Sequence, residues 1–208
     1  LDLRLRPYGT RGTLANPIER LKAYYSTQGE AAPFERQALI KLRWVAGNGP
    51  LGRKMETHRD RYVYSGAPWN LEEALHLRER QMRELVKPGR VNVKYSAGGI
   101  IDVEYDIQYL QIIHGKDRAE LRVPSTLEAL GRLRGFKIIS KEEHDGLRNG
   151  YVFLRALIDA MRIVRGNARD LVLPEDSSEE FKFLARRMGY REPDWETSAD
   201  ALAADIRH

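Results

Sequence analysis

Hydrophobic residues recur at every third or fourth position along most of the chain. The clearest example steps by four, three, four and three residues through Leu147, Tyr151, Leu154, Ile158 and Met161. In an α-helix these positions share one face, and such a regular stripe is typical of a helix packed in a bundle. The pattern therefore predicts a mainly α-helical fold.

The first residues follow a different pattern. Three leucines alternate with one acidic and two basic residues, in the order Leu1, Asp2, Leu3, Arg4, Leu5 and Arg6. Alternation with period two places the leucines on one face of a β-strand and the charges on the other. Pro7 and the turn-forming residues 8–12 end the pattern. A half-buried strand is therefore expected ahead of the helices.

Capping and chain-breaking residues set the expected limits of the helices. They place helices at about residues 17–28, 34–46, 51–62, 71–86, 100–114, 178–188 and 198–208. Two more begin at the capping boxes 125–128 and 140–143. Residues 91–95 alternate and are expected to form a short strand. The turn-like segment 65–68 is the expected boundary between two domains, residues 1–66 and 67–208.

Composition excludes several classes of function. The absence of cysteine excludes disulfides, thiolate zinc sites and a cysteine nucleophile, and it fits a reducing cytosol. No apolar run is long enough to cross a membrane. The net charge of +5 suits a phosphate-bearing ligand without requiring a nucleic acid, and no nucleic-acid-reading motif is present. The chain lacks an initial Met and stops within a predicted helix, so we expect it to be part of a longer protein.

Three segments carry candidate chemistry, and the strand is the first of them. Asp2, Arg4 and Arg6 share its polar face. A carboxylate there is a suitable Mg²⁺ ligand, and guanidinium groups bind phosphates bidentately. A salt-bridged, solvent-facing strand explains the same pattern.

The second segment is the helix that begins at Phe34. Its predicted buried face consists of Phe34, Ala38, Leu42 and Val45, and its charges are distributed around the remaining surface at Glu35, Arg36, Lys41 and Arg43. Lys41 and Arg43 do not share a face, because they are two positions apart. A solvated, charged helix is the simpler interpretation of this spacing.

The third segment is the start of the helix that follows Gly98 and Gly99. Glycines at a helix start leave backbone N–H groups that bind anions well. Asp102 and Glu104 lie in or next to the first turn, where acids also complement the helix dipole without any ligand.

In their order, these segments resemble the glutamine synthetase adenylyltransferase family. The first motif segment is Asp2-Leu-Arg-Leu-Arg-Pro-Tyr-Gly, and the second is Phe34-Glu-Arg-Gln-Ala-Leu-Ile-Lys-Leu-Arg. The third is Gly98-Gly-Ile-Ile-Asp-Val-Glu-Tyr-Asp-Ile-Gln108, and the fourth is Tyr151-Val-Phe-Leu-Arg155. The resemblance extends over nearly the whole chain.

The resemblance implies a mainly α fold: a helical bundle preceded by the strand and helices that end a polymerase-β-type nucleotidyltransferase domain. Members of this bacterial, cytoplasmic family hold two such units in tandem. One unit transfers AMP from ATP, with Mg²⁺, to a tyrosine of glutamine synthetase, and the other removes it by phosphorolysis. PII signal proteins and glutamine set the direction. Which of the two units this chain represents is left open.

The resemblance also assigns roles to residues. Asp2 would be the third metal-binding and catalytic carboxylate, and Arg4, Arg6 and Lys41 would contact nucleotide phosphates. Lys41 would alternatively brace the junction between the domains. The remaining candidates would contact substrate or dock the bundle against the transferase domain: Gly98, Gly99, Asp102 and Glu104.

The chain departs from the family at two points. The paired acids of a Gly-Ser-Asp-x-Asp motif are absent and are expected upstream of Leu1. Nucleotidyl transfer uses metal ions to neutralise both the attacking and the leaving oxygen, so we expect this chain alone to be inactive. Phe34 stands where the family more often has Trp. The alternatives are a helical protein-binding module without catalysis and a PII-uridylyltransferase-like enzyme.

Overall fold

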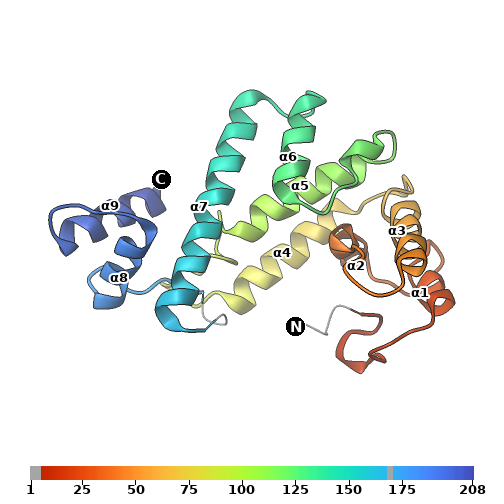
Figure 1. Ribbon diagram of the computed structural model, residues 1–208, viewed down its shortest axis with the longest axis horizontal. Helices are drawn as coiled ribbons and strands as arrows, with labels where there is room; N and C mark the ends of the chain where they lie inside the picture. Colours follow the sequence, from red (N-terminus) through yellow and green to blue (C-terminus); the bar gives the residue numbers. More distant parts are fainter. Residues whose placement is uncertain (1–5, 168–170) are drawn as a thin grey trace. The chain divides into compact units, whose positions relative to one another are not determined.

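The computed structural model describes residues 6–167 and 171–208, and it is mainly helical (Figure 1). Its α-helices are α1 Ile18–Tyr24, α2 Pro33–Ala38, α3 Gly49–Val63, α4 Leu71–Leu85, α5 Ile100–His114, α6 Thr126–Gly135, α7 Lys141–Arg165, α8 Glu179–Met188 and α9 Trp195–Arg207. Short 3₁₀ helices are η1 Gly9–Arg11, η2 Leu39–Lys41 and η3 Ala119–Leu121. The prediction of a mainly α fold is confirmed. The predicted strand falls on residues 1–6, of which all but Arg6 lie outside the described residues.

Side-chain caps explain why several helices begin where the sequence predicts. The Asn70 carboxamide oxygen accepts a hydrogen bond from the Glu73 amide at 3.1 Å, and the Ser178 hydroxyl accepts one from Phe181 at 3.2 Å. Helix α9 begins three residues earlier than expected, because Asp194 rather than Ser198 is its cap and accepts from the Thr197 amide at 2.7 Å. Each cap satisfies a backbone N–H that has no partner within its helix.

Two local predictions fail because polar side chains bond within their own loop. The helix expected at about residues 17–28 covers only Ile18–Tyr24, and Asn16 does not cap it, because the Asn16 carboxamide exchanges hydrogen bonds with Thr13. Residues 91–95 do not form a strand, since Asn92 makes only an isolated bridge to Val172. The Asn92 side-chain oxygen accepts from the amides of Lys94 and Tyr95, which bends the chain into a turn.

The predicted buried face of the second motif segment is wrong. Phe34 is 53% exposed and Val45 is 72% exposed, whereas Arg36 is only 6% exposed. The helix α2 covers only six residues and tightens into η2, and the chain leaves it at Leu42. Positions beyond residue 41 therefore no longer continue the face that begins at Phe34.

The first compact unit comprises the described residues up to Leu75 together with Asp106–Ser140. It contains α1, α2, α3, α6 and the C-terminal part of α5. Its core consists of buried residues from α1, η2, α3 and α5 and from the positions directly after α1 and α3: Tyr24, Tyr25, Leu39, Ile40, Val63, Tyr64 and Ile112. Each unit is therefore assembled from stretches that are separate in sequence, and the domain boundary near residue 66 stays a prediction.

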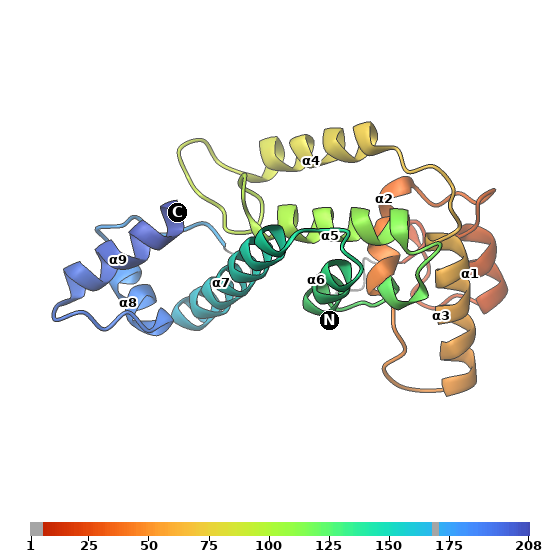
Figure 2. The ribbon, with the colours of Figure 1, turned by 90° about the horizontal axis from the view of Figure 1, so that it is seen from above.

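The second compact unit comprises His76–Tyr105 and Lys141–His208. Both views show α8 against the C-terminal half of α7 and beside α9 (Figure 1, Figure 2). The stripe predicted on α7 is confirmed from Tyr151 onward, since Ile158 and Met161 are buried and Tyr151 and Leu154 pack against the same core. Among the described residues, no helix has the length and hydropathy needed to cross a membrane.

Candidate functional site

The first unit contains an open cleft of about 670 Å³. That volume lies within the range of about 300–1,000 Å³ that is typical of small-molecule sites. The cleft is lined by the turn after the first motif segment, by α1 and by the second motif segment: Arg6, Tyr8, Gly9, Thr10, Arg11, Tyr24, Tyr25, Phe34, Glu35, Ala38, Leu39, Lys41 and Leu42. Two motif segments that are distant in sequence therefore share one cleft.

Arg6 is oriented by the turn that follows it. Its Nε donates to the Gly12 carbonyl at 3.0 Å, and its Nη2 donates to the Thr10 carbonyl at 3.2 Å. These bonds fix a long cationic side chain at the cleft wall. Tyr8, in the same turn, adopts a left-handed backbone with φ of 62°. This conformation is uncommon for a residue other than glycine and is often found at functional sites.

A chain of hydrogen bonds holds the tyrosines that line the cleft. The Tyr8 amide donates to the Tyr24 hydroxyl at 3.3 Å, and this hydroxyl donates to Oε1 of Glu35 at 2.8 Å. The Tyr8 hydroxyl donates to Glu30 at 2.8 Å, which raises the pKa of Tyr8. Burial raises the pKa of Tyr24 and Tyr25. These side chains therefore stay neutral phenols at physiological pH and add no negative charge.

Lys41 lies in the same cleft as Arg6, as its predicted role requires. Its ammonium donates to the Pro124 carbonyl at 3.1 Å and to the Thr126 hydroxyl at 2.7 Å, at the start of α6. These contacts fit a residue that holds two segments of the protein together, and Lys41 also lines the cleft. Asp2 and Arg4, the other candidates of this group, lie outside the described residues.

The described residues do not by themselves fit a magnesium ion. No group of three Asp, Glu or His side chains with suitable geometry occurs among residues 6–167 and 171–208. Glu35, the acid among the described residues that line the cleft, already accepts hydrogen bonds from the Tyr24 hydroxyl at 2.8 Å and from the Ala32 amide at 3.1 Å. A metal at this cleft would therefore depend on Asp2 and on acids outside the described part of the chain.

Sequence reasoning missed two residues of the second motif segment, Arg36 and Gln37. Arg36 donates from Nε and Nη2 to the Val63 carbonyl, at 2.9 and 2.7 Å, and from Nη1 to the Ala67 carbonyl at 3.0 Å. The Gln37 amide donates to the side-chain oxygen of Gln108 at 2.9 Å, which joins the second and third motif segments. Arg36 and Gln37 lie three positions before Leu39 and Ile40, which are buried. Residues three apart share a helix face, so this spacing could have indicated that Arg36 and Gln37 are buried as well.

The first part of the third motif segment, residues 98–104, is engaged within the second unit. Asp102 accepts from the backbone amide of Gly98 at 2.8 Å and from Nε of Arg78 at 2.5 Å. Arg78 also donates to the Ser96 carbonyl at 3.1 Å. The two acid oxygens thus join the start of α5 to the loop before it and to α4, which is a structural function.

Glu104 is placed beside the fourth motif segment. Its Oε1 accepts a hydrogen bond from the Tyr151 hydroxyl of α7 at 3.3 Å. The two acids of the third motif segment therefore connect α5 to its neighbours, Asp102 to α4 and Glu104 to α7. The predicted substrate contact of Asp102 and Glu104 stays untested, and their observed partners are groups of the protein itself.

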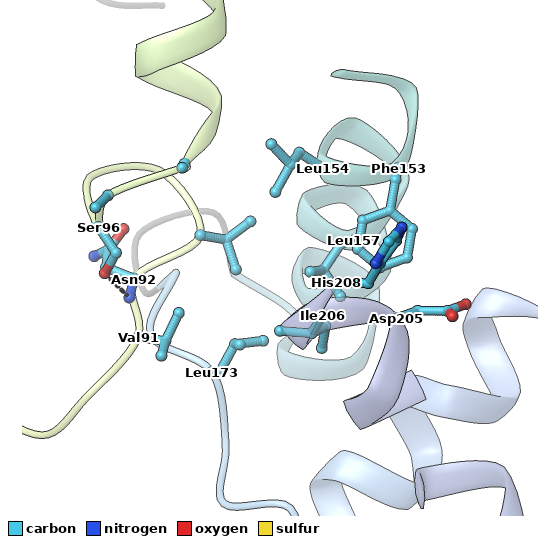
Figure 3. Close-up of a pocket in the computed structure, with 14 residues that line it drawn as sticks. Val91, Asn92, Ser96, Phe153, Leu154, Leu157, Leu173, Asp205, Ile206 and His208 are labelled. Carbon is cyan, nitrogen blue, oxygen red and sulfur yellow. Dashed lines mark hydrogen bonds between the residues drawn. The ribbon is translucent and has the colours of Figure 1, made fainter. Parts of the chain in front are cut away.

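Gly98 and Gly99 line a second, smaller cavity of about 190 Å³ in the second unit. Figure 3 shows Asn92 and Ser96 on the loop side and Leu154, Leu157, Leu173 and Ile206 from elsewhere in the unit. Aliphatic side chains line much of this cavity, together with Asp205 and His208, and the polar groups of the loop bond to the loop backbone.

A Gly99→Ala substitution is expected to destabilise the protein by roughly 1–3 kcal/mol. An added Cβ would lie 2.8 Å from the carbonyl oxygens of Lys94 and Ser96, and these backbone atoms cannot move without disturbing the turn. Gly131→Ala is the matched control, because a Cβ there meets nothing within 4 Å and α6 gains helix propensity. Urea unfolding measures both variants, and equal stability of Gly99→Ala and wild type would contradict the close packing.

Two family models match the chain. Residues 69–208 match the model described as GlnD PII-uridylyltransferase, and residues 1–58 match the one described as glutamate-ammonia ligase adenylyltransferase. The first match covers more than half of the chain, so its helical part belongs to the PII-uridylyltransferase family of domains. The gap between the two matches includes residue 66, the proposed domain boundary.

Curated relatives match both of these regions of the chain. A bifunctional glutamine synthetase adenylyltransferase/adenylyl-removing enzyme of Mycobacterium avium is 31% identical over 100% of this chain and 21% of its own length. Enzymes with the same name from Pseudomonas putida and Stenotrophomonas maltophilia are 32% and 35% identical, over 97% and 98% of the chain and 20% and 22% of their lengths. The chain belongs to the glutamine synthetase adenylyltransferase family.

Proposed function

We propose that this chain is part of a bifunctional glutamine synthetase adenylyltransferase/adenylyl-removing enzyme. The observation that carries the proposal is the alignment of relatives with that name to nearly every residue of the chain, from the first motif segment to α9. The chain spans about a fifth of the length of these relatives. Within such an enzyme it supplies the end of a nucleotidyltransferase domain, residues 1–66, and the helical domain that follows, residues 67–208.

The proposed reaction moves AMP from ATP to a tyrosine of glutamine synthetase, or removes it by phosphorolysis. Bound Mg²⁺ would neutralise the oxygens at the reacting phosphorus. Asp2 would hold the metal together with acids outside this chain, and Arg4, Arg6 and Lys41 would bind the phosphates of ATP. The position of Arg6 and Lys41 on one cleft supports their shared role. A PII signal protein would act as the regulatory partner that sets the direction.

The contacts of the chain's own residues indicate how it supports this chemistry. The turn carbonyls of Thr10 and Gly12 orient Arg6, and the start of α6 orients Lys41. Both cations are thus held before a substrate arrives, and interactions that are organised in advance cost less when the transition state forms. Arg36 and Gln37 hold α2 in place beneath the cleft.

Isotope transfer tests the proposal in the longer enzyme that contains this chain. With Mg²⁺, glutamine synthetase and ATP labelled at the α-phosphate, the label is expected to appear on a tyrosine of the synthetase. ATP labelled at the γ-phosphate is the control and should leave the synthetase unlabelled. Orthophosphate should then release the label as ADP if the adenylyl-removing activity is present.

A second candidate function is uridylyl transfer to a PII protein, which the match of residues 69–208 favours. The same enzyme incubated with labelled UTP and a PII protein would label the PII protein in that case. Labelling of the PII protein without labelling of glutamine synthetase would reject the proposed function. Labelling of neither protein would reject both functions.

A further inference from the structure

An exposed apolar cluster lies where the loop after η2 meets the start of α3 in the first unit. Trp44 is 46% exposed, Leu51 is 48% exposed, and Val45 is the most exposed of the three at 72%. Figure 2 shows the loop between α2 and α3 projecting from the unit. Single exposed apolar residues are common on protein surfaces, but a cluster of them often marks an interaction site.

Helix α3 fixes the position of the Trp44 side chain. A Cβ added to Gly52 would lie 2.3 Å from Cδ1 of Trp44, so the ring lies directly on the backbone of α3 at this glycine. The Trp44 amide donates to Oε1 of Glu56 at 2.8 Å, one turn further along the same helix. The ring is therefore in place before a partner arrives, and a side chain that is already ordered loses less conformational entropy on binding.

Positive charge flanks the cluster along the chain. Arg43, Arg53 and Lys54 are exposed, and none of them forms an ion pair with another described residue. Residues 43–54 contain no Asp or Glu. Glu56, the next carboxylate along the chain, already accepts the hydrogen bond from Trp44. An acidic partner would complement these three cations.

The combination of apolar and cationic side chains favours a protein segment over other anionic partners. Trp and Arg are enriched among the side chains that contribute most to protein–protein binding. A nucleic acid would bind the cations and stack on Trp44, but it would leave Val45 and Leu51 without apolar contacts. A lipid surface would require the apolar side chains to insert, whereas the Trp44 ring lies against α3.

We infer that residues 43–54 dock an acidic segment of a partner protein that carries an apolar side chain. The apolar side chain packs on Trp44, and the carboxylates of the segment lie toward the three cations. The surface begins directly after Leu42, which lines the cleft. Two residues of extended chain span at most about 7 Å, so a segment held at Trp44 lies beside the cleft. The inference concerns a protein contact and does not depend on the proposed reaction.

A synthetic amphipathic peptide tests the inference, with leucines at three- and four-residue spacing and glutamates at the other positions. The full 208-residue chain is expected to bind this peptide at physiological salt, measured by fluorescence anisotropy of the labelled peptide. Trp44→Ala should weaken binding at least about tenfold, as is usual for loss of a central aromatic anchor, and Trp44→Phe should retain most of the binding. Trp195→Ala is the matched control, because Trp195 is 45% exposed in the second unit and should leave binding unchanged.

A charge variant keeps the test independent of any effect of Trp44→Ala on folding. Arg53→Glu should weaken binding of the peptide at least about fivefold and reduce its dependence on salt, with no change in melting temperature. Arg61→Glu is its control, because it reverses an exposed charge of α3 outside residues 43–54. This control should change binding by less than about twofold.

Two further peptides separate the apolar anchor from the charge. Replacing the leucines with serines, or the glutamates with lysines, should abolish measurable binding. Wild-type affinity in Trp44→Ala or Arg53→Glu, equal binding of the serine peptide, or no binding of the original peptide would each overturn the inference. Binding of single-stranded DNA or of phosphatidylserine vesicles that exceeds peptide binding and is lost in Trp44→Ala would identify another class of partner and would also overturn it.

Discussion

An Asp2→Asn substitution in the longer enzyme is expected to lower the rate of AMP transfer by at least about 10³-fold. A metal ion that stabilises developing charge contributes several kcal/mol to the transition state, and each 1.4 kcal/mol corresponds to a factor of about ten. Asparagine keeps the size of the side chain but removes the charge that would hold Mg²⁺. If the same unit also removes AMP, phosphorolysis should fall by a similar factor.

The pattern of the kinetic change distinguishes a metal ligand from a structural acid. Asp2→Asn should lower kcat and raise the Mg²⁺ concentration needed for half-maximal rate, with little change in melting temperature. Asp117→Asn is the control, because Asp117 is exposed and lies away from the cleft lining. Full activity of Asp2→Asn would remove Asp2 from the metal site, and the role of the first motif segment would then lie with its arginines.

Arg36→Ala is expected to reduce the free energy of unfolding by about 3 kcal/mol or more. The guanidinium is buried and donates hydrogen bonds to carbonyls at the end of α3 and in the segment that follows, including Val63 and Ala67. Loss of the side chain leaves these carbonyls without their donor and leaves a cavity, and each contribution costs between about 1 and 3 kcal/mol. Urea unfolding with native-state hydrogen exchange would locate the loss in α3.

Two further variants test the cause of that loss. Arg36→Lys keeps a charge but offers no planar set of donors, so it should recover only part of the stability. Arg43→Ala removes an exposed cation from the same motif segment and should change stability by less than about 0.5 kcal/mol. A loss below about 1 kcal/mol for Arg36→Ala would show that water replaces the guanidinium without strain.

Helices with a strong apolar stripe or a side-chain cap were predictable from sequence. The stripe on α7 and the cap at Asn70 involve residues close together in the chain, so their chemistry is visible locally. The turn at residues 92–96 was not predicted, because apolar and polar residues alternate there as they do in a strand. The Asn92 side chain instead accepts hydrogen bonds from the backbone amides of Lys94 and Tyr95. The alternation does not show that a side chain competes with a neighbouring strand for these amides.

The candidate site shows a different limit of prediction from the sequence. The family resemblance implies that Arg6 and Lys41 contact nucleotide phosphates or that Lys41 braces the domain junction; both residues line one cleft, and their roles stay predictions. The burial of Arg36 was not expected, because hydrophobicity patterns treat an arginine as a surface residue. Its partners are backbone carbonyls 27 or more residues away, and no feature of their side chains marks them in the sequence.

The discontinuous first unit imposes an order on folding during synthesis. The carboxamide partner of Gln37 is Gln108, and the ammonium partners of Lys41 are Pro124 and Thr126. A growing chain that has emerged only through α3 therefore contains Gln37 before Gln108 has been made, and Lys41 before Pro124 and Thr126 have been made. The ribosome must release well over half of these 208 residues before the wall of the cleft is complete, so that wall is a late product of translation.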